Sequence, residues 1–318
     1  MLRHYLPSVV QYSTLPDTEI VVADNGSDDE SLDVLCDFPT VRVIQLPKNY
    51  GFAEGYNRAL EYIDATYTVL LNSDVEVTEG WLQPLLDYLD THADVAAVMP
   101  KIRSDRQRTC FEHAGAAGGK MDQLVYPYCR GRILDYVEQD NGQYDCITPV
   151  FWTTGACMCV RTNVYKELGG LDSDFFAHME EIDLCWRMQC RGYRLMCLPQ
   201  TMVYHLGGGS LAYESPRKTY LNFRNCLLML YKNLPRRQLV QVWLARFVLD
   251  YVAGLHLLLC GKGKNALAVL QARLDFWRMR QKFVAKRREN IEKAIVPYPE
   301  TIDQRSILVD YYFRGKRQ

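Results

Sequence analysis

The chain has 318 residues, enough to bury a full core, and its 48% hydrophobic and 24% charged residues are ordinary for a soluble globular protein. Internal repeats and low-complexity segments are absent from the sequence, which excludes a repeat architecture. The formal net charge of −1 hides an asymmetry. From Lys232 onward the chain has eighteen Lys and Arg against seven Asp and Glu, whereas the residues before Lys232 include 19 Lys and Arg against 31 Asp and Glu. A basic end of this kind indicates an anionic partner, either a nucleic acid or a membrane surface.

The eleven cysteines are odd in number and scattered through apolar runs. Pairs such as Cys157-x-Cys159 lack the C-x2-C repeats of a zinc site. Reduced thiols in a cytosolic protein are the better account, because structural disulfides belong to oxidising compartments. The N-terminus shows no basic, apolar and cleavage-site series of a signal peptide.

Helical and strand patterns alternate along the first third of the chain. Residues 2–12 carry apolar side chains at helical spacing, and further helices begin at Glu30 and within residues 48–53. Short apolar strands are predicted at residues 19–23, 41–46, 66–71 and 95–99. This alternation predicts an α/β fold with a mostly parallel sheet and helices on both faces. In such sheets ligands bind at the carboxyl ends of the strands, where the polar residues of this sequence gather.

One strand is missing from this pattern. The helix at residues 2–12 should follow a first, central strand, and none precedes it in the sequence. Either the helix is misassigned or the N-terminus is incorrect or shortened, and we favour the second interpretation.

The most informative segment runs from residue 178 to residue 187, with the sequence HMEEIDLCWR. Three carboxylates fall within four residues at the start of a predicted amphipathic helix, and Gly192 stands where a C-terminal cap is expected. Acids in a first helical turn can be explained by their favourable interaction with the positive end of the helix dipole alone. Here they lie between an aromatic loop around Phe176 and the glycine-rich turn of residues 205–210, which favours a site for proton transfer.

Five motifs follow one another in the sequence. They are VADNGSD at 22–28, KNYGFA at 48–53, LNSD at 71–74, the pair Gly155-Ala156, and FFAHMEEID at 175–183. Each is weak alone, but the series in this order and spacing resembles family 2 glycosyltransferases, most closely the bacterial rhamnosyltransferase-type members. The resemblance covers roughly residues 1–230 and implies the GT-A fold. We therefore expect a GT-A domain over residues 1–228 and a basic, mainly helical extension over residues 229–318.

The resemblance places a nucleotide-sugar donor on the first three motifs. Asp24 ends a strand, where it would accept hydrogen bonds from a uracil or thymine base; a turn aspartate with local bonds is the alternative. Asn49 and Gly51 begin a helix whose amide N–H groups can face phosphate or ribose, although Asn-x-Gly is also an everyday turn. The residues expected to bind the donor are Asp24, Asn25, Ser27, Asn49, Gly51, Ala53, Asn57, Asn72 and Ser73.

Asn72-Ser73-Asp74 occupies the place of the family's Asp-x-Asp element, which holds a divalent cation against the donor diphosphate. Mg²⁺ and Mn²⁺ share carboxylates with substrate phosphates, so either is the expected cofactor. Asn replaces the first Asp, which leaves Asp74 as the only charged ligand of the triplet; Glu76 is better explained as a solvated side chain. His205 matches a histidine that adds a ligand in related enzymes, although a lone His is more often structural.

An inverting transfer needs a carboxylate that takes the proton of the acceptor hydroxyl as its oxygen attacks the anomeric carbon. By the resemblance Glu181 is this base, with a longer side chain than the Asp of many members. Glu180 and Asp183 are reserves, expected to bind acceptor or to orient the helix, and Arg187 is expected to pair with a nearby acid. The acceptor side is expected to be lined by Trp152, Gly155, Asp172, Phe176 and His178.

The C-terminal part contains one apolar and one basic segment. Gln238 to Cys260 is strongly apolar, but Arg246 and Asp250 interrupt it, so a transmembrane span is not predicted. Arg273 to Arg288 carries seven bases among apolar and aromatic residues. A helix of that kind either lies in a membrane interface or packs on the main domain.

Together these features predict a cytoplasmic, inverting, metal-assisted glycosyltransferase of cell-surface polysaccharide synthesis. It would use a UDP- or dTDP-sugar and a saccharide or lipid-linked acceptor, and contact the inner membrane face through its basic helices. A nucleotidyltransferase is less favoured, because the glycine-rich signature with Arg and Lys is absent from the sequence. A catalytically degenerate sugar-nucleotide binder is the main alternative, favoured by Asn72 and the missing strand and opposed by the carboxylate cluster. Nucleic-acid binding is not expected, since no recognition motif accompanies the basic end.

Overall fold

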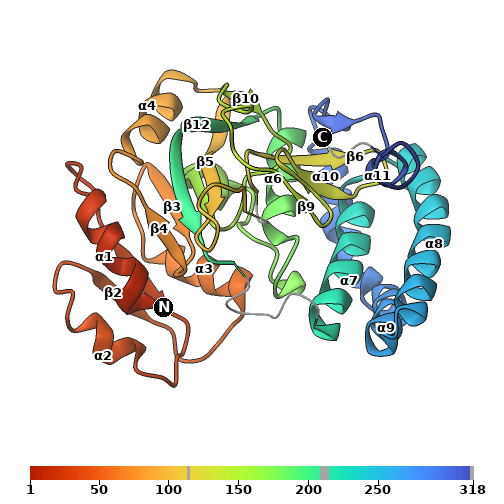
Figure 1. Cartoon of the computed structure of the whole chain (residues 1–318), viewed down its shortest axis with the longest axis horizontal. Helices are drawn as coiled ribbons and strands as arrows, with labels where there is room; N and C mark the ends of the chain where they lie inside the picture. The colour runs from red at the N-terminus through yellow and green to blue at the C-terminus, as the bar shows by residue number, and fades with distance from the viewer. Residues whose placement is uncertain (113–114, 208–214, 316–318) are drawn as a thin grey trace.

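The computed structural model describes residues 1–112, 115–207 and 215–315 of the chain. A small N-terminal lobe, a central layer built on a sheet, and a group of C-terminal helices follow one another along the long axis of the molecule (Figure 1). Of the glycine-rich turn noted in the sequence, residues 208–210 lie outside the described ranges.

The N-terminal lobe has a small core of its own. Its two strands pair in parallel, with Val21 opposite Arg42, and Leu6, Leu35 and Val41 form its buried cluster. The helices and strands expected from the sequence are confirmed here, each displaced by no more than a few residues. They are α1 (Leu2–Tyr12), β1 (Val21–Asp24), α2 (Ser31–Leu35) and β2 (Arg42–Gln45).

The central sheet carries the main core. Its strand order is β10-β12-β5-β11-β3, with β4 paired to β12. The first eight residues of β5, apolar apart from Lys101, are buried between two neighbouring strands. Its strands are β3 (Tyr67–Leu71), β4 (Val75–Val77), β5 (Val95–Ser104), β10 (Thr148–Pro149), β11 (Cys157–Arg161) and β12 (Arg194–His205). The helical segments of this layer are α3 (Phe52–Glu61), α4 (Gln83–Thr91), α5 (Thr162–Glu167), the 3-10 turn η1 (Ser173–Phe175) and α6 (Glu180–Cys190).

The α/β class is confirmed, whereas the sheet is mixed rather than mostly parallel. β12 runs parallel to β5, but β11 runs antiparallel to both β5 and β3. β3 and β5 therefore point in the same direction, as the alternating pattern predicted, with β11 inserted between them. The first third of the sequence could not show this insertion, because β11 lies far downstream of the strands that it separates.

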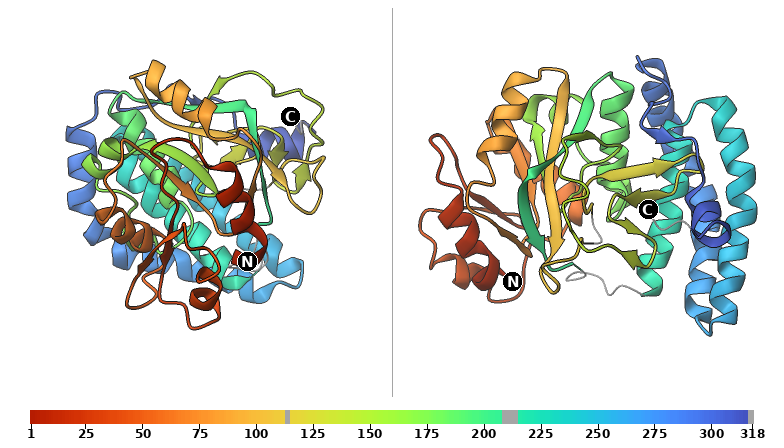
Figure 2. Two further views of the ribbon diagram at one scale, coloured as in Figure 1. Left: turned by 90° about the vertical axis from the view of Figure 1, so that its left-hand side faces the viewer. Right: turned by 45° about the horizontal axis from the view of Figure 1, so that its top comes forward.

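Two strand edges face the space between the lobe and the central sheet. Among the described residues β1 pairs only with β2, and β3 pairs only with β11, in agreement with the expected lack of a first, central strand. Figure 2 shows the β1–β2 pair standing apart from the sheet. Instead, α1 connects the lobe to the central layer: the Tyr5 hydroxyl donates to Asp105 at 2.8 Å, and the backbone N–H of Val77 donates to Ser8 Oγ at 3.2 Å.

The C-terminal helices pack on the central layer through α7 (Pro216–Asn233), which contacts α6, α9 and α10. The domain boundary expected at residue 228 falls inside α7, and the division stays a prediction. The other helical segments are α8 (Arg236–Leu259), α9 (Gly263–Met279), the 3-10 turn η2 (Arg280–Lys282), α10 (Phe283–Glu292) and α11 (Ile307–Phe313). A second sheet joins β6 (Gly119–Asp122), β7 (Pro127–Cys129), β8 (Arg132–Ile133), β9 (Tyr136–Val137) and β13 (Ile302–Asp303). All eleven cysteines are free thiols, as the sequence predicted.

Candidate active site

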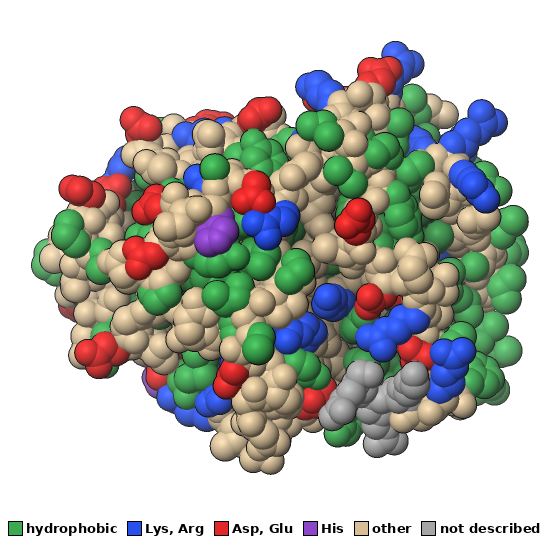
Figure 3. Space-filling model, turned by 90° about the horizontal axis from the view of Figure 1, so that it is seen from above, with side chains coloured by type: hydrophobic (Ala, Val, Ile, Leu, Met, Phe, Trp, Pro, Cys, Tyr) green, Lys and Arg blue, Asp and Glu red, His purple; other side chains and the backbone are tan. Residues whose placement is uncertain are grey.

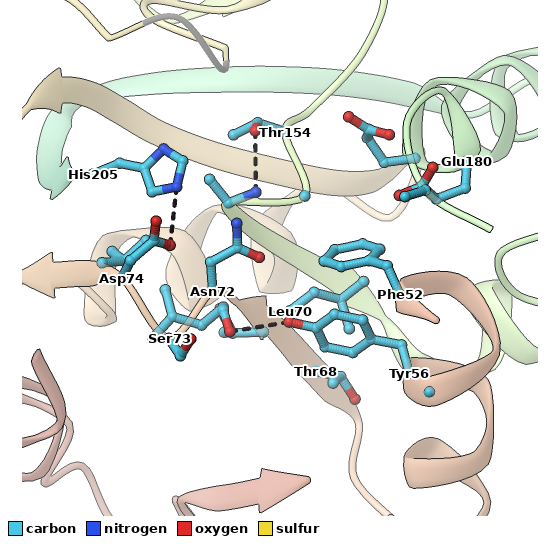
Figure 4. A pocket seen from close by; sticks show the side chains of 18 of the residues that line it. Phe52, Tyr56, Thr68, Leu70, Asn72, Ser73, Asp74, Thr154, Glu180 and His205 are labelled. Atoms are coloured by element: carbon cyan, nitrogen blue, oxygen red, sulfur yellow. Dashed lines mark hydrogen bonds and ion pairs between the residues drawn. The ribbon is translucent and has the colours of Figure 1, made fainter. Parts of the chain in front are cut away.

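A large cleft opens between the N-terminal lobe and the central layer. Its volume is about 1960 Å³, and its lining includes residues that follow β1, β2 and β3 and the loop before α6. Figure 4 shows Asn72, Ser73 and Asp74 at the end of β3, with His205 above Asp74 and Glu180 on the opposite wall. Polar side chains therefore meet at the carboxyl ends of the strands, as the sequence predicted.

The side chain of Asn25 joins the loops after β1 and β2 through hydrogen bonds. Its Oδ1 accepts from the Tyr50 N–H at 3.0 Å, and its Nδ2 donates to the carbonyl oxygen of Gly51 at 2.9 Å. Asn49 Oδ1 accepts from the Gly51 N–H at 2.8 Å, one residue before α3 begins. Gly51 has a φ of +83°, and a Cβ there would lie 2.9 Å from the Phe176 ring, so glycine alone suits this turn. The two loops form one unit at the rim of the cleft.

His205, at the end of β12, bridges two carboxylates. Its Nε2 lies 3.1 Å from Asp74 Oδ1, and its Nδ1 lies 3.1 Å from Glu112 Oε2. Burial works to lower the pKa of His205, but the hydrogen bonds to both carboxylates outweigh it and raise the pKa to about 9. Burial also works against the charged form of Asp74, yet His205 holds the pKa of that carboxyl below its usual value. At neutral pH the bridge is an imidazolium between two carboxylates.

The chemistry of this bridge suits a divalent cation. Carboxylate oxygen and imidazole nitrogen are both ligands of Mn²⁺, and Glu112 behind the ring matches the outer carboxylate that orients a metal-bound histidine. Across residues 1–112, 115–207 and 215–315, no group of three or more His, Cys, Asp and Glu side chains is placed to hold a metal. Asp74 and His205 would therefore supply two ligands and leave the remaining positions to substrate phosphates and water.

The loop before α6 has a strained backbone. Phe176, His178 and Met179 have φ values of +67°, +69° and +75°, a region that residues other than glycine rarely adopt. Strain of this kind costs roughly 1–3 kcal/mol for each residue and persists only where the surroundings fix it. The loop turns into α6, whose first residue is Glu180.

Asn225 of α7 fixes this strained loop. Its buried Nδ2 donates to the carbonyl oxygens of Phe175, Ala177 and His178 at 3.0, 2.8 and 2.8 Å. Its Oδ1 accepts from the Arg224 guanidinium at 2.7 and 2.9 Å, and Arg224 also donates to the Phe175 carbonyl at 3.0 Å. Helix α7 therefore positions the segment that presents a histidine and two glutamates to the cleft.

The two glutamates differ in exposure and in charge. Glu180 is 4% exposed, and its Oε2 has no hydrogen-bond partner among the described residues. Burial, helped by the charge of Glu181, raises the pKa of Glu180 well above its usual value and so favours the protonated form of this carboxyl. Glu181 is partly exposed in the cleft, and burial raises its pKa to about 6. At neutral pH Glu181 is thus ionised, and its pKa is close to the value that suits a general base.

His178 lines the same wall of the cleft as a neutral imidazole. Burial, followed by the charge of Lys218, lowers its pKa to about 4. Its buried Nε2 has no hydrogen-bond partner in the described structure, which leaves this atom for a hydroxyl group of a ligand. Trp152 and Gly155 line the cleft as well, and the indole N–H of Trp152 donates to the Lys120 carbonyl at 2.9 Å.

Residues 1–152 match the family model described as glycosyl transferase family 2. This chain carries a family 2 glycosyltransferase domain. It is similar to the N-acetylglucosaminyl-diphospho-decaprenol L-rhamnosyltransferase of Mycobacterium tuberculosis (strain CDC 1551 / Oshkosh), with 25% identity over 220 residues. That alignment covers 64% of this chain and 71% of the relative. The family resemblance and its rhamnosyltransferase-like character are confirmed.

Solved glycosyltransferase structures share the fold of this glycosyltransferase. The structure of S. aureus TarS 1–349 in complex with UDP-GlcNAc has a TM-score of 0.57 and 16% identity, and covers 92% of this chain and 85% of the TarS chain. The structure of GalNAc-T7 with UDP, GalNAc and Mn²⁺ has a TM-score of 0.55 and 16% identity. It covers 74% of this chain, which spans 46% of the GalNAc-T7 chain. The expected GT-A fold is confirmed, and at these identities the similarity concerns the fold alone.

Most of the residues predicted for the glycosyltransferase site line one cleft. On the donor side they are Asn25, Asn49, Gly51, Asn72 and Ser73, and on the acceptor side Trp152, Gly155, Phe176 and His178. The remaining ones are Asp74, His205, Glu180 and Glu181. The structure brings these residues together, and their individual roles stay predictions.

Asp183 and Asp172 lie in buried salt bridges and do not line the cleft. Asp183 is fully buried and pairs with Arg187 and with Lys232, both at 2.8 Å. Asp172 pairs with Lys232 at 2.6 Å and with Lys286, and the two ammonium groups outweigh burial and hold the pKa of Asp172 below its usual value. Asp183 as a reserve base and Asp172 as an acceptor ligand are therefore corrected, because these charges join α6, α7 and α10. The expected pairing of Arg187 with an acid is confirmed.

Four of the residues predicted to bind the donor do not line the cleft either. Asn57 is corrected to a supporting residue, because its amide is bonded to the Tyr165 hydroxyl at 2.7 Å and to a backbone carbonyl at 2.7 Å. Ala53 is fully buried in the core and is corrected in the same way. Asp24 Oδ1 accepts from the Ser27 N–H at 3.2 Å, the local turn bond that the sequence left open as an alternative. Donor binding by Asp24 and Ser27 stays a prediction.

The sequence did not point to Glu112 or Asn225. Glu112 reaches the site only because β12 lies beside β5, which brings His205 opposite Ser104. Asn225 had a readable signal, since it follows Arg224 and precedes the apolar run of residues 226–230. A polar pair next to such a run is expected to be buried and hydrogen-bonded.

Replacing Asn225 tests the clamp on the strained loop. We expect Asn225→Ala to lower kcat by about 100-fold, because displacement of a catalytic group by about 1 Å has an effect of that order. It also leaves buried carbonyl oxygens without partners, at a cost of about 1–3 kcal/mol each in unfolding free energy. The measurements are kcat and the affinity for nucleotide, taken well below the melting temperature.

A buried amide elsewhere in the fold is the control. Asn290 of α10 donates to Asn233 Oδ1 at 3.0 Å and has no hydrogen bond to the strained loop. Asn290→Ala should lower the melting temperature without a comparable loss of kcat. A similar kcat in both variants would contradict the positioning role of Asn225.

Proposed function

We propose that this glycosyltransferase transfers a sugar, with inversion, from a UDP- or dTDP-sugar to a saccharide or lipid-linked saccharide in cell-surface polysaccharide synthesis. The observation that supports the proposal most is that one cleft holds an ionised Glu181 and the pair of Asp74 and His205. The mycobacterial relative is named for an N-acetylglucosaminyl-diphospho-decaprenol acceptor, which supports a lipid-linked acceptor here. TarS was solved with UDP-GlcNAc, which supports a nucleotide-sugar donor.

In the proposed reaction, the acceptor hydroxyl oxygen attacks the anomeric carbon from the face opposite the nucleoside diphosphate. The new C–O bond forms while the bond between the anomeric carbon and the diphosphate oxygen breaks. Glu181 takes the hydroxyl proton in this step. Burial favours the protonated form of Glu180, which makes it a poorer acceptor of that proton. The Nε2 of His178 would orient the acceptor through a hydrogen bond.

Mn²⁺ or Mg²⁺ is the proposed cofactor, held by Asp74 and His205. GalNAc-T7, which shares the fold, was solved with Mn²⁺. When bound, a divalent cation neutralises charge on a departing diphosphate. Because Asn72 stands in place of a second carboxylate, we expect the cation to bind mainly together with the donor diphosphate.

We place the enzyme in the cytoplasm, at the inner face of the membrane. A lipid-linked acceptor would be found there, and the C-terminal part is basic, with eighteen Lys and Arg against seven Asp and Glu from Lys232 onward. Anionic headgroups attract such a segment by about 1 kcal/mol for each base near the surface.

Release of nucleoside diphosphate tests the reaction. The purified protein is supplied with UDP-, dTDP- or GDP-sugars, Mn²⁺ or Mg²⁺, and a polyprenyl diphosphate-linked saccharide. We expect metal-dependent release from a UDP- or dTDP-sugar, stimulated by the acceptor. Nucleotide binding by calorimetry without release from any donor would overturn the transferase and support the sugar-nucleotide binder, which the Asn72 substitution favours.

A further inference from the structure

The outer face of the hairpin formed by α8 and α9 is apolar. Leu244, Val248 and Leu255 of α8, and Leu274 and Trp277 of α9, are each more than half exposed. Hydrophobic side chains gather along the edge of the molecule that these helices occupy, with Lys and Arg beside them (Figure 3). Soluble proteins rarely leave a continuous apolar patch larger than a few hundred Å² in water. This face is therefore expected to be covered by a partner.

The two charges in the middle of α8 point into the protein. Arg246 and Asp250 are both buried, with Arg246 Nε 3.1 Å from Asp250 Oδ1. Arg273 of α9 pairs with the same carboxylate at 2.6 Å, and Arg246 Nη1 donates to the Val125 carbonyl at 3.1 Å. A surface helix normally turns its charges to water, and the middle of α8 does the reverse.

This network bears on how α8 can meet a membrane. By length and composition, α8 is the one helix within the described ranges that could cross a bilayer. Crossing would pull Arg246 and Asp250 away from Arg273 and Val125, and breaking a buried ion pair is strongly destabilising because it leaves a buried charge uncompensated. The network instead holds α8 lengthwise on the domain, in line with the sequence-based prediction that it does not span.

Bases alone flank the apolar face. Arg236 and Arg237 are exposed at the start of α8, and Lys262 and Lys264 are exposed at the turn into α9. Asp275 is the only acid of residues 236–279 that is not buried, and it is held in a salt bridge within α9. Two copies joined through this face would bring bases against bases, whereas an anionic surface complements them.

Two bases of the basic segment predicted from the sequence, residues 273–288, face the protein. Lys286 is bonded to Asp172 and, at 2.8 Å, to Asp174, and Arg287 donates to the Tyr231 carbonyl. These contacts direct both bases toward the protein, so they contribute little to an outer surface.

We propose that the outer face of the α8–α9 hairpin lies in the interface of an anionic lipid bilayer, with α8 parallel to the membrane plane. The 24 residues of α8 give a contact about 36 Å long at 1.5 Å per residue. Apolar side chains enter the boundary between headgroups and acyl chains, the flanking bases meet anionic headgroups, and Trp277 lies at the depth that indole favours. The inference deepens the membrane contact proposed above and does not depend on the transfer reaction.

Flotation of the full chain with vesicles tests this surface. The vesicles contain phosphatidylcholine alone or mixed with phosphatidylglycerol. We expect the wild-type protein to float with the anionic vesicles. Leu244→Gln/Leu255→Gln should partition at least about tenfold more weakly, because it removes two leucines that the membrane would bury. Replacing Arg236, Arg237, Lys262 and Lys264 by Gln should weaken binding by about fivefold for each base and remove the preference for phosphatidylglycerol.

The matched control is Tyr62→Gln/Ile147→Gln, which removes two exposed hydrophobic residues elsewhere on the surface and should float like the wild type. Leu244 and Leu255 do not line the cleft, so release of nucleoside diphosphate with a soluble acceptor should be unchanged in Leu244→Gln/Leu255→Gln. Wild-type protein that fails to float would overturn the proposal, above all if light scattering shows a dimer that Leu244→Gln/Leu255→Gln disrupts. Resistance to alkaline carbonate extraction would overturn it in favour of a spanning helix.

Discussion

Glu181→Gln is expected to lower kcat by about 10²- to 10⁴-fold, the usual contribution of a general base. The amide has nearly the shape of the carboxylate but cannot take the acceptor proton. Binding of the donor should change little, since Glu181 is proposed to act on the acceptor hydroxyl. The measurement is the steady-state rate of nucleoside diphosphate release, together with the dissociation constant of the nucleotide.

The neighbouring glutamate provides the control. Glu180 is buried, and burial favours its protonated form, so Glu180→Gln changes the charge less than Glu181→Gln does and should keep most of the wild-type rate. The pH profile adds a second check: kcat/KM of the wild type should fall about tenfold per unit below pH 6, because Glu181 is then protonated. An equal loss in both variants, or a flat profile between pH 5 and 7, would show that Glu181 is not the base.

The second large effect is expected at Asp74. Asp74→Asn leaves the triplet after β3 with no carboxylate, so affinity for Mn²⁺ should fall by at least about 100-fold and stimulation of turnover by Mn²⁺ should disappear. The measurements are Mn²⁺ titrations of the rate and of binding in the presence of nucleoside diphosphate. Glu76→Gln is the matched control, because Glu76 pairs with Arg108 at 2.6 Å and does not line the cleft.

The protonated bridge makes metal binding depend on pH. A metal-bound imidazole must be neutral, whereas His205 has a pKa of about 9 in the metal-free protein. Binding should therefore release about one proton, and apparent affinity should rise about tenfold per pH unit until pH approaches 9. Calorimetry in buffers of different ionisation enthalpy measures this proton. A pH-independent affinity would mean that His205 does not bind the cation.

The local parts of the fold and site were readable in the sequence. Strands β1, β2 and β3 follow from short apolar runs, and the polar residues after each run line one cleft because the carboxyl ends of these strands meet. The turn that ends α6 followed from Gly192, which has a φ of +88°. Patterns of this kind act within a few residues, and a single sequence displays them directly.

Contacts between distant segments were not readable in the same way. The insertion of β11 between β5 and β3 depends on strand pairing across the chain, for which one sequence gives no register. Asp183 looked like a candidate base because the sequence does not show that it is paired. Its partner Lys232 lies 49 residues away, on another helix. Arg246 and Asp250 argued against a span in the sequence, and that stays a prediction; the direction in which their side chains point depends on Arg273 and Val125.

The separation of the β1–β2 pair from the central sheet has a consequence for folding cooperativity. Sheet hydrogen bonds usually make neighbouring strands unfold as one unit, and here none of the described ones joins the lobe to β3. The lobe would thus open at a lower free energy than the rest of the protein. A nucleotide held between Asn25 and Ser73 would act as a non-covalent bridge, and its binding free energy would add the coupling that the backbone does not supply.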